Sequence, residues 1–378
     1  MRFRVAHAGI DPDGDDSGAV AQWQGWRDLA ARCLDRLGGG AGTLGILYVS
    51  EPLAADLPAL FEHIAARTGV PRWVGAVAPA VCAGGSDYFN GPAIAAMVCD
   101  LPDDALHRVD GGADETPALA AWSAARQPSL GIVHADPRNP AVVETVPALA
   151  AAAGAFLVGG LTSAVPGGQI ADGVTEGGLS GVLFAGEVAV ATGLTQGCSP
   201  IGPVRTVTAV DGRAITELDG KPAFAAFRED IGEVLARDLR RVAGYIHGAL
   251  PVPGSDTGDY LVRNLAALDP SAGSVTIAAP LAEGDRVMFV RRDAASAVED
   301  LRRMLASLKR RVGNGAVRGA VYHSCVARGP NQFGPGAREL GAIRETFGDI
   351  PLVGFFGNGE ISHDRLYTYT GVLTLFVE

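Results

Sequence analysis

The stretch IPLVGFFGNGEI at residues 350–361 decides our interpretation of the fold. Its apolar residues lead to a Val-Gly pair, and glycine, asparagine and glutamate follow closely, which is typical of a buried strand that runs into a loop. Shorter versions occur as PRWVGAV at 71–77 and AFLVGGL at 155–161, each with Val-Gly where the strand should end. The sequence therefore predicts three copies of one unit, with a site at the ends of their strands.

Each of these strands belongs to a segment whose pattern predicts the order strand, helix, strand, helix, strand, strand. The first two segments are residues 1–106 and 107–195, and the third lies within 251–378. Similar spacing favours duplication: distances of 30, 28 and 35 residues separate the glycines of the three Val-Gly pairs from Gly45, Gly131 and Gly319. We expect an α/β fold with some α+β character, in which repeated units form mixed sheets flanked by helices.

A segment of different character, residues 204–248, separates the second and third copies. Its first part, VRTVTAVDGRAITEL, predicts a hairpin around the Asp-Gly pair. A long amphipathic helix should follow, with an apolar face that contains Phe224, Phe227, Ile231, Leu235, Leu239 and Ile246. The Pro- and Gly-rich run at 251–259 is typical of a linker. We therefore predict an N-terminal domain over 1–250 and a C-terminal domain over 251–378.

The composition argues against several classes of partner. With 31 basic and 42 acidic residues, the formal net charge is −11, and this balance repels phosphate backbones and anionic lipids. No basic cluster is larger than the one at 309–311, so we expect neither nucleic acid nor a membrane surface as a partner. The most apolar long run, 141–161, contains Glu144 and Pro147 and predicts a helix and a core strand rather than a membrane span.

The cysteines indicate a reducing compartment. The five of them are scattered without a C-x-x-C pair, so neither a disulfide framework nor a zinc site is expected. The N-terminus does not read as a secretory signal, which also favours a cytoplasmic protein. The sequence has no closely spaced His pair of a metal site and no Gly-rich nucleotide-binding motif, so we expect no metal and no cofactor.

Four motifs together resemble a known family. They are GCSPIGPVRTVTAVDGRAITELDGKPAFAAF at 197–227, YLVRNL at 260–265, HSCVARG at 323–329 and GFFGNGEISH at 354–363. In this order they resemble the paired N- and C-terminal FIST domains, a module of bacterial signal-transduction proteins and of a eukaryotic F-box protein. The resemblance covers almost the whole chain, with the N-terminal part near 43–250 and the C-terminal part near 251–378.

This resemblance implies an intracellular sensory or ligand-binding module for small molecules, with amino acids among the candidates. The chain departs from the family pattern at GAVAP, residues 75–79, because the family's first Val-Gly strand usually continues with Cys, Ser and Thr. The change removes hydroxyl and thiol donors from one candidate site. No kinase, cyclase or receptor segment accompanies the motifs, so a separate partner would have to carry the signal.

The loop after the third Val-Gly strand is our first candidate binding site. Asn358, Gly359 and Glu360, together with His363, could present backbone N–H groups and a carboxylate to the ammonium or hydroxyl group of a ligand. The alternative is a tight turn with a solvated Glu360. Ligands collect at such strand ends in α/β sheets, which favours the binding site.

Two arginines could add contacts to an anion. Arg328 lies just past a predicted strand and could clamp a carboxylate, although an ordinary surface salt bridge would explain it equally well. Arg263 lies in another predicted strand and could supply a second contact or only cap its hairpin. Asp136 and Arg138 hold the corresponding loop position in the second copy, so we expect the two loops to flank one cleft.

The cysteines allow a different function. His323 and Cys325 alternate onto the same face of a strand, and a cysteine beside a histidine could act as a nucleophile. A free cysteine in an apolar strand is more often a small core residue, and no third orienting group is evident. Cys198 lies in a Pro- and Gly-rich turn and is the second candidate thiol.

The sequence thus predicts an intracellular, non-catalytic sensory protein that binds a small ligand, an amino acid or a small carboxylate, and acts through a separate signalling partner. A cysteine-dependent enzyme that uses Cys325 or Cys198 is the first alternative. A scaffold for protein interactions, with an exposed apolar patch, is the second.

Overall fold

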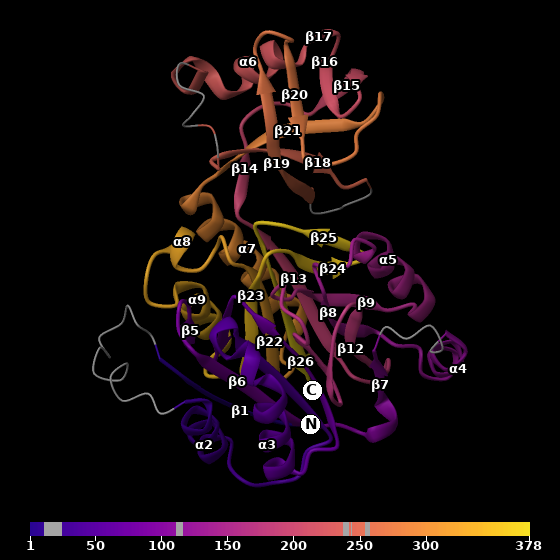
Figure 1. The fold of residues 1–378 in the computed structure, drawn as a ribbon, viewed down its shortest axis with the longest axis vertical. Coiled ribbons are helices and arrows are strands. Elements are labelled where there is room, and N and C mark those ends of the chain that lie inside the picture. Colours follow the sequence, from indigo (N-terminus) through magenta and orange to yellow (C-terminus); the bar gives the residue numbers. More distant parts are fainter. Residues whose placement is uncertain (11–24, 111–115, 237–241, 243, 254–257) are drawn as a thin grey trace. The chain divides into compact units, whose positions relative to one another are not determined.

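The computed structural model describes residues 1–10, 25–110, 116–236, 242, 244–253 and 258–378. The chain divides into two compact units (Figure 1). The first unit holds residues 1–195, 301–366 and 370–378, and the second holds 196–300 and 367–369. The second unit therefore follows the second copy, includes the start of the third copy up to residue 300, and has a short return at 367–369.

The three predicted copies, which we call repeats 1, 2 and 3, each show the predicted order of elements, which confirms the mixed α/β fold. Repeat 1 consists of β1 (Arg2–Gly9), α2 (Trp26–Leu37), β2 (Leu44–Ser50), α3 (Leu57–Thr68), β3 (Arg72–Ala78) and β6 (Ala93–Asp100). Repeat 2 consists of β7 (Leu106–Val109), α4 (Thr116–Arg126), β8 (Leu130–Ala135), α5 (Val142–Ala153), β9 (Phe156–Leu161) and β12 (Leu179–Phe184). Repeat 3 consists of β21 (Arg286–Arg292), α7 (Ala294–Val312), β22 (Val317–Cys325), α9 (Arg338–Phe347), β23 (Leu352–Gly357) and β26 (Thr370–Val377).

Each repeat also has a short hairpin between its Val-Gly strand and its last strand. These hairpins are β4 (Ala80–Ala83) with β5 (Ser86–Tyr88), β10 (Gln169–Ala171) with β11 (Val174–Thr175), and β24 (Glu360–His363) with β25 (Arg365–Tyr367). Short helices complete the repeats: η1 (Glu51–Asp56), η2 (Asp103–Ala105) and α8 (Pro330–Phe333). The apolar pattern from Val20 to Leu37 predicts one helix in the sequence; α2 covers its C-terminal part, and Val20 and Trp23 lie outside the described residues.

The repeats form three six-stranded sheets with one common order: first strand, last strand, second strand, Val-Gly strand, and then a hairpin. In repeat 3 the first position is taken by β13 (Val190–Gln196), because β21 pairs in the second unit instead. The second strand and the Val-Gly strand are parallel in every repeat, and the other pairings are antiparallel. The sheets are therefore mixed, as predicted.

The hairpins are exchanged among the repeats. The hairpin of repeat 1 pairs with β23, that of repeat 2 pairs with β3, and that of repeat 3 pairs with β9. In Figure 1 the yellow strands β24 and β25 accordingly lie beside the magenta β9. Each sheet is therefore completed by another repeat in a closed cycle, and no repeat has a complete sheet of its own.

The glycines of the three Val-Gly pairs have a shared structural reason. Gly75, Gly159 and Gly354 pair with the second strand so closely that an added Cβ would lie 1.9, 1.8 and 1.8 Å from a backbone carbonyl oxygen there. Such a contact is impossible for any other residue. The register also corrects our alignment, because Ala320 rather than Gly319 is equivalent to Gly45 and Gly131.

The inner faces of the three sheets pack into one apolar core, and helices cover the outer faces. In repeat 1, Ile46 belongs to the shared core, whereas Leu47 packs with residues of α2 and α3. Residues of α5 pack in the same way on Val133 of repeat 2. Among the helices that the structure describes, none is long and apolar enough to cross a membrane.

The second unit is mainly antiparallel strands. These are β14 (Cys198–Pro200), β15 (Arg205–Asp211), β16 (Ala214–Leu218), β17 (Lys221–Pro222), β18 (Ile246–Pro251), β19 (Tyr260–Asp269), β20 (Ser274–Ile277) and β21. The pairings run from β21 through β15, β16, β20, β19 and β18 back to β21, so they close a ring. Helix α6 (Ala223–Ala236) packs on it, and the predicted Asp-Gly hairpin is the connection between β15 and β16.

The expected long helix of this region needs correction, and the expected linker and domain boundary fall at paired strands. The long helix is wrong at its C-terminal end, because Ile246 begins β18 and Gly232 already interrupts α6 with a φ of 76°. Leu239 lies outside the described residues. The expected linker at 251–259 joins the paired strands β18 and β19, with residues 254–257 outside the described chain. The domain boundary predicted at residue 250 falls within β18, which pairs with a strand on each side.

Candidate functional site

The second strands of the three repeats meet through three side chains. The glycine of each Val-Gly pair is paired with a residue of the second strand, and the next residue of that strand carries the side chain in question. These residues are Tyr48 on β2, His134 on β8 and His323 on β22. The hydroxyl of Tyr48 lies 3.0 Å from Nε2 of His134 and 3.0 Å from Nε2 of His323. All three side chains are buried. The second strands therefore converge at these side chains, whereas the sequence-based prediction concerned the ends of the Val-Gly strands.

Side chains fill the point of convergence. The ring centroid of Phe355 lies 5.0 Å from that of Tyr48 and 4.9 Å from that of His323. The positions equivalent to Phe355 in the other repeats are Ala76 and Gly160, so one large ring occupies the space that two small residues leave. The predicted site at the strand ends therefore does not lie at this point of convergence, where side chains fill the space.

The central hydrogen bonds fix the protonation of the two histidines. A tyrosine hydroxyl has one hydrogen, so Tyr48 donates to one imidazole and accepts from the other. The histidines therefore carry their protons on different ring nitrogens. Burial lowers the pKa of both His134 and His323 to about 3, and the nearby His134 contributes further to the shift at His323. Both rings are neutral at physiological pH.

These histidines should make the protein sensitive to acid. Their pKa is near 6.5 in the unfolded chain and about 3 in the folded one, so the unfolded state gains protons first as the pH falls below 6.5. The free energy of unfolding should then fall, with each histidine contributing roughly 1.4 kcal/mol per pH unit once the pH is well below 6.5. Urea unfolding of His134→Phe between pH 7 and 5 should show a shallower slope than the wild type, and an unchanged slope would contradict the assignment.

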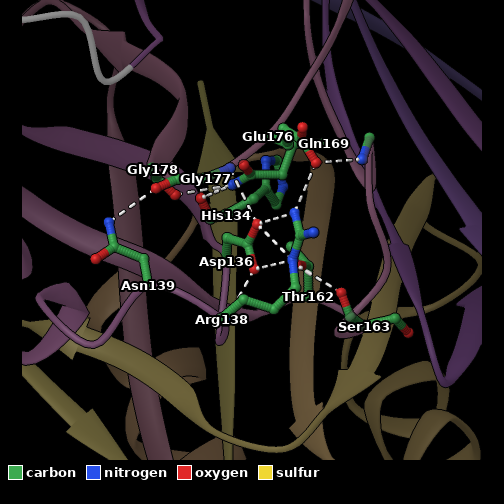
Figure 2. A network of polar contacts seen from close by, with 11 residues as sticks. His134, Asp136, Arg138, Asn139, Thr162, Ser163, Gln169, Glu176, Gly177 and Gly178 are labelled. Carbon is green, nitrogen blue, oxygen red and sulfur yellow. Dashed lines mark hydrogen bonds and ion pairs between the residues drawn. The ribbon is translucent and has the colours of Figure 1, made fainter.

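Beyond the centre, the strand ends of repeats 1 and 2 carry separate polar networks. Ser50 on β2 donates to the carbonyl of Gly91 at 2.8 Å. Figure 2 shows the network of repeat 2, in which the guanidinium of Arg138 points at Asp136, with contacts of 2.6 to 3.1 Å. Arg138 also binds Glu176 at 2.8 Å. Asp136 and Arg138 therefore pair with each other, and their charges are already compensated.

Hydrogen bonds keep Asp136 ionised. Burial raises the pKa of this carboxyl, but hydrogen bonds from the side chain and backbone of Arg138 and from the backbone of Gly177 outweigh it and hold the pKa below its usual range. Gln169 completes the network by donating to the carbonyls of His134 and Gly178 at 2.7 and 3.0 Å (Figure 2). We interpret this network as a structural lock of the repeat 2 loops.

In repeat 3 the strand ends hold a buried ion pair. Arg328 is 0% exposed, and its Nε and Nη2 lie 2.9 and 2.8 Å from Oε1 of Glu339. Glu339 also accepts hydrogen bonds from the hydroxyl of Tyr322 at 2.7 Å and the backbone of Gly329 at 2.9 Å. Burial lowers the pKa of Arg328, but the charge of Glu339 outweighs it and the net shift is upward. Arg328 is therefore charged, and its ion pair with Glu339 is buried, so the alternative of an ordinary surface salt bridge is wrong.

Glu360 is the second buried charge-bearing residue of repeat 3. Its side chain is 1% exposed, and its Oε2 accepts hydrogen bonds from Oγ1 and the backbone of Thr370 at 2.7 and 3.2 Å. Burial raises the pKa of Glu360 to about 8, against the opposing effects of Thr370 and Arg328. The carboxyl is mainly protonated at pH 7, so the alternative of a solvated Glu360 is wrong.

The remaining loop residues lie in two different environments. Asn358 is exposed, whereas Gly359 is buried and its carbonyl accepts a hydrogen bond from Leu161 at 2.8 Å. His363 is exposed and contacts Asp364 at 3.0 Å. It lines a surface pocket of about 500 Å³ at the C-terminal end of α5. His363 therefore belongs to a separate surface and does not face Glu360 in the loop core.

Arg263 lies in the second unit and not with the other candidates. It is on β19, opposite Gly248 of β18, and its Nη1 donates to the carbonyl of Val262 at 2.8 Å. Burial lowers its pKa. Arg328 and Glu360 both belong to repeat 3, where the charge of Arg328 acts on Glu360, while Arg263 belongs to a different unit.

The cysteines provide a test of the enzyme alternative. All five are buried, including Cys198 and Cys325, and Nε2 of His323 already contacts Tyr48. Burial also raises the pKa of the Cys33 thiol to about 12. We expect iodoacetamide to label the native protein at pH 7.5 far more slowly than the urea-unfolded protein. Rapid labelling of Cys198 or Cys325 in the native state, located by peptide mass spectrometry, would support the enzyme instead.

Several residues of the site were not identified from the sequence. In the sequence, Tyr48 and His134 look like ordinary members of apolar strands. Their equivalence to His323 becomes clear only when the second strands are aligned by their pairing with the Val-Gly strands. Glu339 opens a predicted helix, where an acidic residue is common for other reasons. Within the described part of the chain, no group of three His, Cys, Asp or Glu side chains is placed to hold a metal ion.

Comparisons with known proteins bear on the whole chain. The FIST N domain matches residues 43–221, and the FIST C domain matches residues 223–363. Two uncharacterised proteins of Mycobacterium tuberculosis, one from strain CDC 1551 and one from strain H37Rv, are each 30% identical over 382 residues, which cover 93% of this chain and 95% of each relative. An uncharacterised protein of Mycobacterium bovis is 36% identical over 216 residues, covering 54% of this chain and 55% of that protein.

Proposed function

The chain belongs to the FIST family, whose domains are sensory and signal-transduction modules, and from this premise we propose that it is an intracellular sensor of a small molecule that carries an ammonium and a carboxylate group. An amino acid is the simplest ligand of this kind. A separate protein partner would carry the signal onward. The observation that supports this proposal is the pair of incompletely satisfied charged side chains in repeat 3.

Arg328 and Glu360 each have an atom without a partner. Among the residues that the structure describes, they are the two buried Arg, Lys, Asp or Glu side chains with atoms that lack a hydrogen bond. These atoms are Oε1 of Glu360 and both Nη1 and Nη2 of Arg328, of which Nη2 lies 2.8 Å from Oε1 of Glu339 as an ion pair. Buried polar groups are normally hydrogen-bonded, and an unsatisfied one costs roughly 1–3 kcal/mol. Strongly perturbed titratable groups also concentrate at functional sites. A ligand that satisfies both atoms would remove this cost.

The two groups have complementary chemistry for a zwitterion. A ligand ammonium could donate to Oε1 of Glu360, and it would favour the ionised carboxylate, so that the Glu360 proton is released on binding. A ligand carboxylate could accept from Nη1 of Arg328. Both side chains are enclosed, so the proposal requires the turn at 358–359 to open, and Asn358 is the exposed residue of that turn.

A thermal-shift screen tests the proposed function. The panel would contain the twenty amino acids, their 2-keto acids and short dicarboxylates, with wild type, Glu360→Gln and the exposed control Glu62→Gln. We expect at least one amino acid to raise the melting temperature of wild type and of Glu62→Gln, and to act much more weakly on Glu360→Gln. No stabilisation by any compound, or equal stabilisation of Glu360→Gln, would contradict the proposal.

Glu360→Gln should also change the pH dependence of stability without any ligand. The pKa of Glu360 is about 8 in the folded state and near 4.5 in the unfolded one, so wild type loses stability as the pH rises between these values. Gln resembles the protonated carboxyl and does not titrate. The variant should therefore exceed wild type in free energy of unfolding by an amount that grows from pH 5 to pH 8, by up to roughly 1.4 kcal/mol per pH unit. A constant difference in urea unfolding would refute the raised pKa.

A further inference from the structure

A basic groove lies where repeat 1 meets repeat 3, away from Glu360. We call it the arginine groove and define it by Arg4 on β1, Arg36 on α2, Arg344 on α9 and Gly84 in the β4–β5 turn. Its volume is about 470 Å³, within the usual range of small-molecule sites. Its position between two repeats means that only the assembled first unit can form it.

The charges of this groove are poorly compensated. Arg4 donates to four backbone carbonyls, at 2.8 to 3.4 Å, and Arg36 donates to the carbonyl of His7 at 2.8 Å; the acceptors of Arg4 are Leu37, Gly38, Gly40 and Ala41. These acceptors are neutral, and no described carboxylate forms an ion pair with either arginine. Arg344 has one distant partner, Asp349, at 3.9 Å, and this aspartate also lines the groove, so three arginines face one carboxylate. The groove is therefore positive in a protein with a formal net charge of −11.

The hairpin exchange supplies an internal comparison for the groove. Gly84, Asp172 and His363 hold equivalent positions in the three hairpins. Each lies three residues after the hairpin residue that pairs with Phe355, Ala76 or Gly160, respectively. Their φ angles agree, at 58°, 59° and 60°. The same turn thus occurs three times on the surface of the first unit, with a different side chain in each copy.

At the equivalent turn of repeat 2, a carboxylate of the protein itself forms an ion pair with the nearby arginine. The arginine groove has no carboxylate at this position. Oδ2 of Asp172 lies 3.5 Å from Nη1 of Arg108, and Asp110 lies 2.7 Å from Nη2 of the same arginine. In the arginine groove the equivalent residue is Gly84, which brings no side chain. A Cβ at Gly84 would meet only Nε2 of His7, at 3.8 Å, so space is available there.

We propose that the arginine groove binds a small organic anion whose negative group takes the place of the carboxylate that Gly84 does not supply. The groove also has an apolar part, formed by Val5, Leu37, Leu340, Ile343 and Leu352. The ligand is therefore a carboxylate or phosphate attached to a short apolar body. Guanidinium groups suit both anions because they donate two hydrogen bonds in one plane.

Two substitutions at Gly84 separate charge from shape. Gly84→Asp reproduces Asp172 and places a carboxylate in the groove, whereas Gly84→Asn has nearly the same shape without the charge. Both residues tolerate the positive φ of this turn, as Asp172 does. Circular dichroism and the melting temperature would verify that each variant folds. The pair therefore tests the charge without disturbing the arginines or the Glu360 site.

Isothermal titration calorimetry with hexanoate, hexyl phosphate and 1-hexanol gives the readout, with the full chain at low ionic strength. We expect one or both anions to bind wild type and Gly84→Asn, to bind Gly84→Asp at least about tenfold more weakly, and to bind less tightly at high salt. The two anions distinguish a carboxylate site from a phosphate site. Equal binding of hexanol, equal binding to Gly84→Asp, or no binding of either anion would overturn the proposal.

The result is independent of the proposed sensor function. Glu360→Gln should leave the affinity of the arginine groove for hexanoate or hexyl phosphate unchanged, and Gly84→Asp should leave stabilisation by an amino acid unchanged. If the Gly84→Asp substitution by itself removed both the binding of the organic anion and the stabilisation by an amino acid, one site would account for both effects. This result would contradict two separate sites.

Discussion

Gly159→Ala is expected to prevent the protein from folding to its native state. An alanine Cβ at this position would lie 1.8 Å from the carbonyl oxygen of Val133 on the neighbouring parallel strand, and the φ of 142° adds strain. Neither group can move away, because both belong to paired strands in the middle of a sheet. We expect a loss of more than about 5 kcal/mol in free energy of unfolding, or no recoverable folded protein.

Gly341→Ala provides the matched control. This glycine lies inside α9, and an added Cβ would meet no atom within 4 Å outside its own helix. The same substitution should there stabilise the protein by about 0.5–1 kcal/mol, because alanine is the better helix former. Urea unfolding followed by circular dichroism measures both variants. A Gly159→Ala protein with near-wild-type stability would contradict the close approach of the strands.

Glu339→Gln should have the second largest effect. It keeps the shape of the side chain but removes the negative charge beside Arg328, which is 0% exposed and has no other ion-pair partner among the described residues. Breaking one partner of a buried ion pair typically costs about 3–5 kcal/mol, because the other charge stays buried and uncompensated. We expect a loss of this size in urea unfolding at pH 7.

An exposed pair serves as the comparison for this result. Arg344 and Asp349 lie 3.9 Å apart with side chains that are 61% and 90% exposed. Asp349→Asn should therefore leave the free energy of unfolding unchanged within error, because solvent screens exposed pairs. Similar small effects for Glu339→Gln and Asp349→Asn would mean that Arg328 is solvated, which would remove one of the two groups on which the proposed ligand site depends.

Much of the fold could be predicted because it is local. The Val-Gly strands are apolar runs that end at a glycine, and the helices beside them have apolar positions at helical spacing, so each element shows in its own residues. The Asp-Gly hairpin between β15 and β16 was also predictable from its own residues. These signals do not depend on distant parts of the chain.

The exchange of hairpins could not be predicted in the same way. The sequence AVCA of β4 is compatible with pairing in the sheet of its own repeat as well as with the observed pairing with β23. Backbone hydrogen bonds alone do not identify the partner strand. The choice depends on how three distant repeats pack around Tyr48 and Phe355. Local sequence patterns contain no information about that packing.

The candidate site shows the same division. Glu360 and Arg328 were identified from residue type and position at strand ends, but their environment was not, because Thr370 and Glu339 come from other elements. His363 was grouped with Glu360 because it is three residues away in a strand, although alternation places it on another surface and the turn gives it a positive φ. Proximity in sequence was a poor guide at this position.

Proton release on ligand binding is the most direct test of the central claim, that Glu360 is a buried protonated carboxyl which receives a ligand ammonium. The amino acid that gives the largest thermal shift would be titrated into the protein at pH 7 in two buffers of different ionisation enthalpy. With a pKa of about 8, wild type should release roughly 0.9 proton per ligand bound, and Glu360→Gln should release none. Binding without proton release, or equal release from both proteins, would contradict the account.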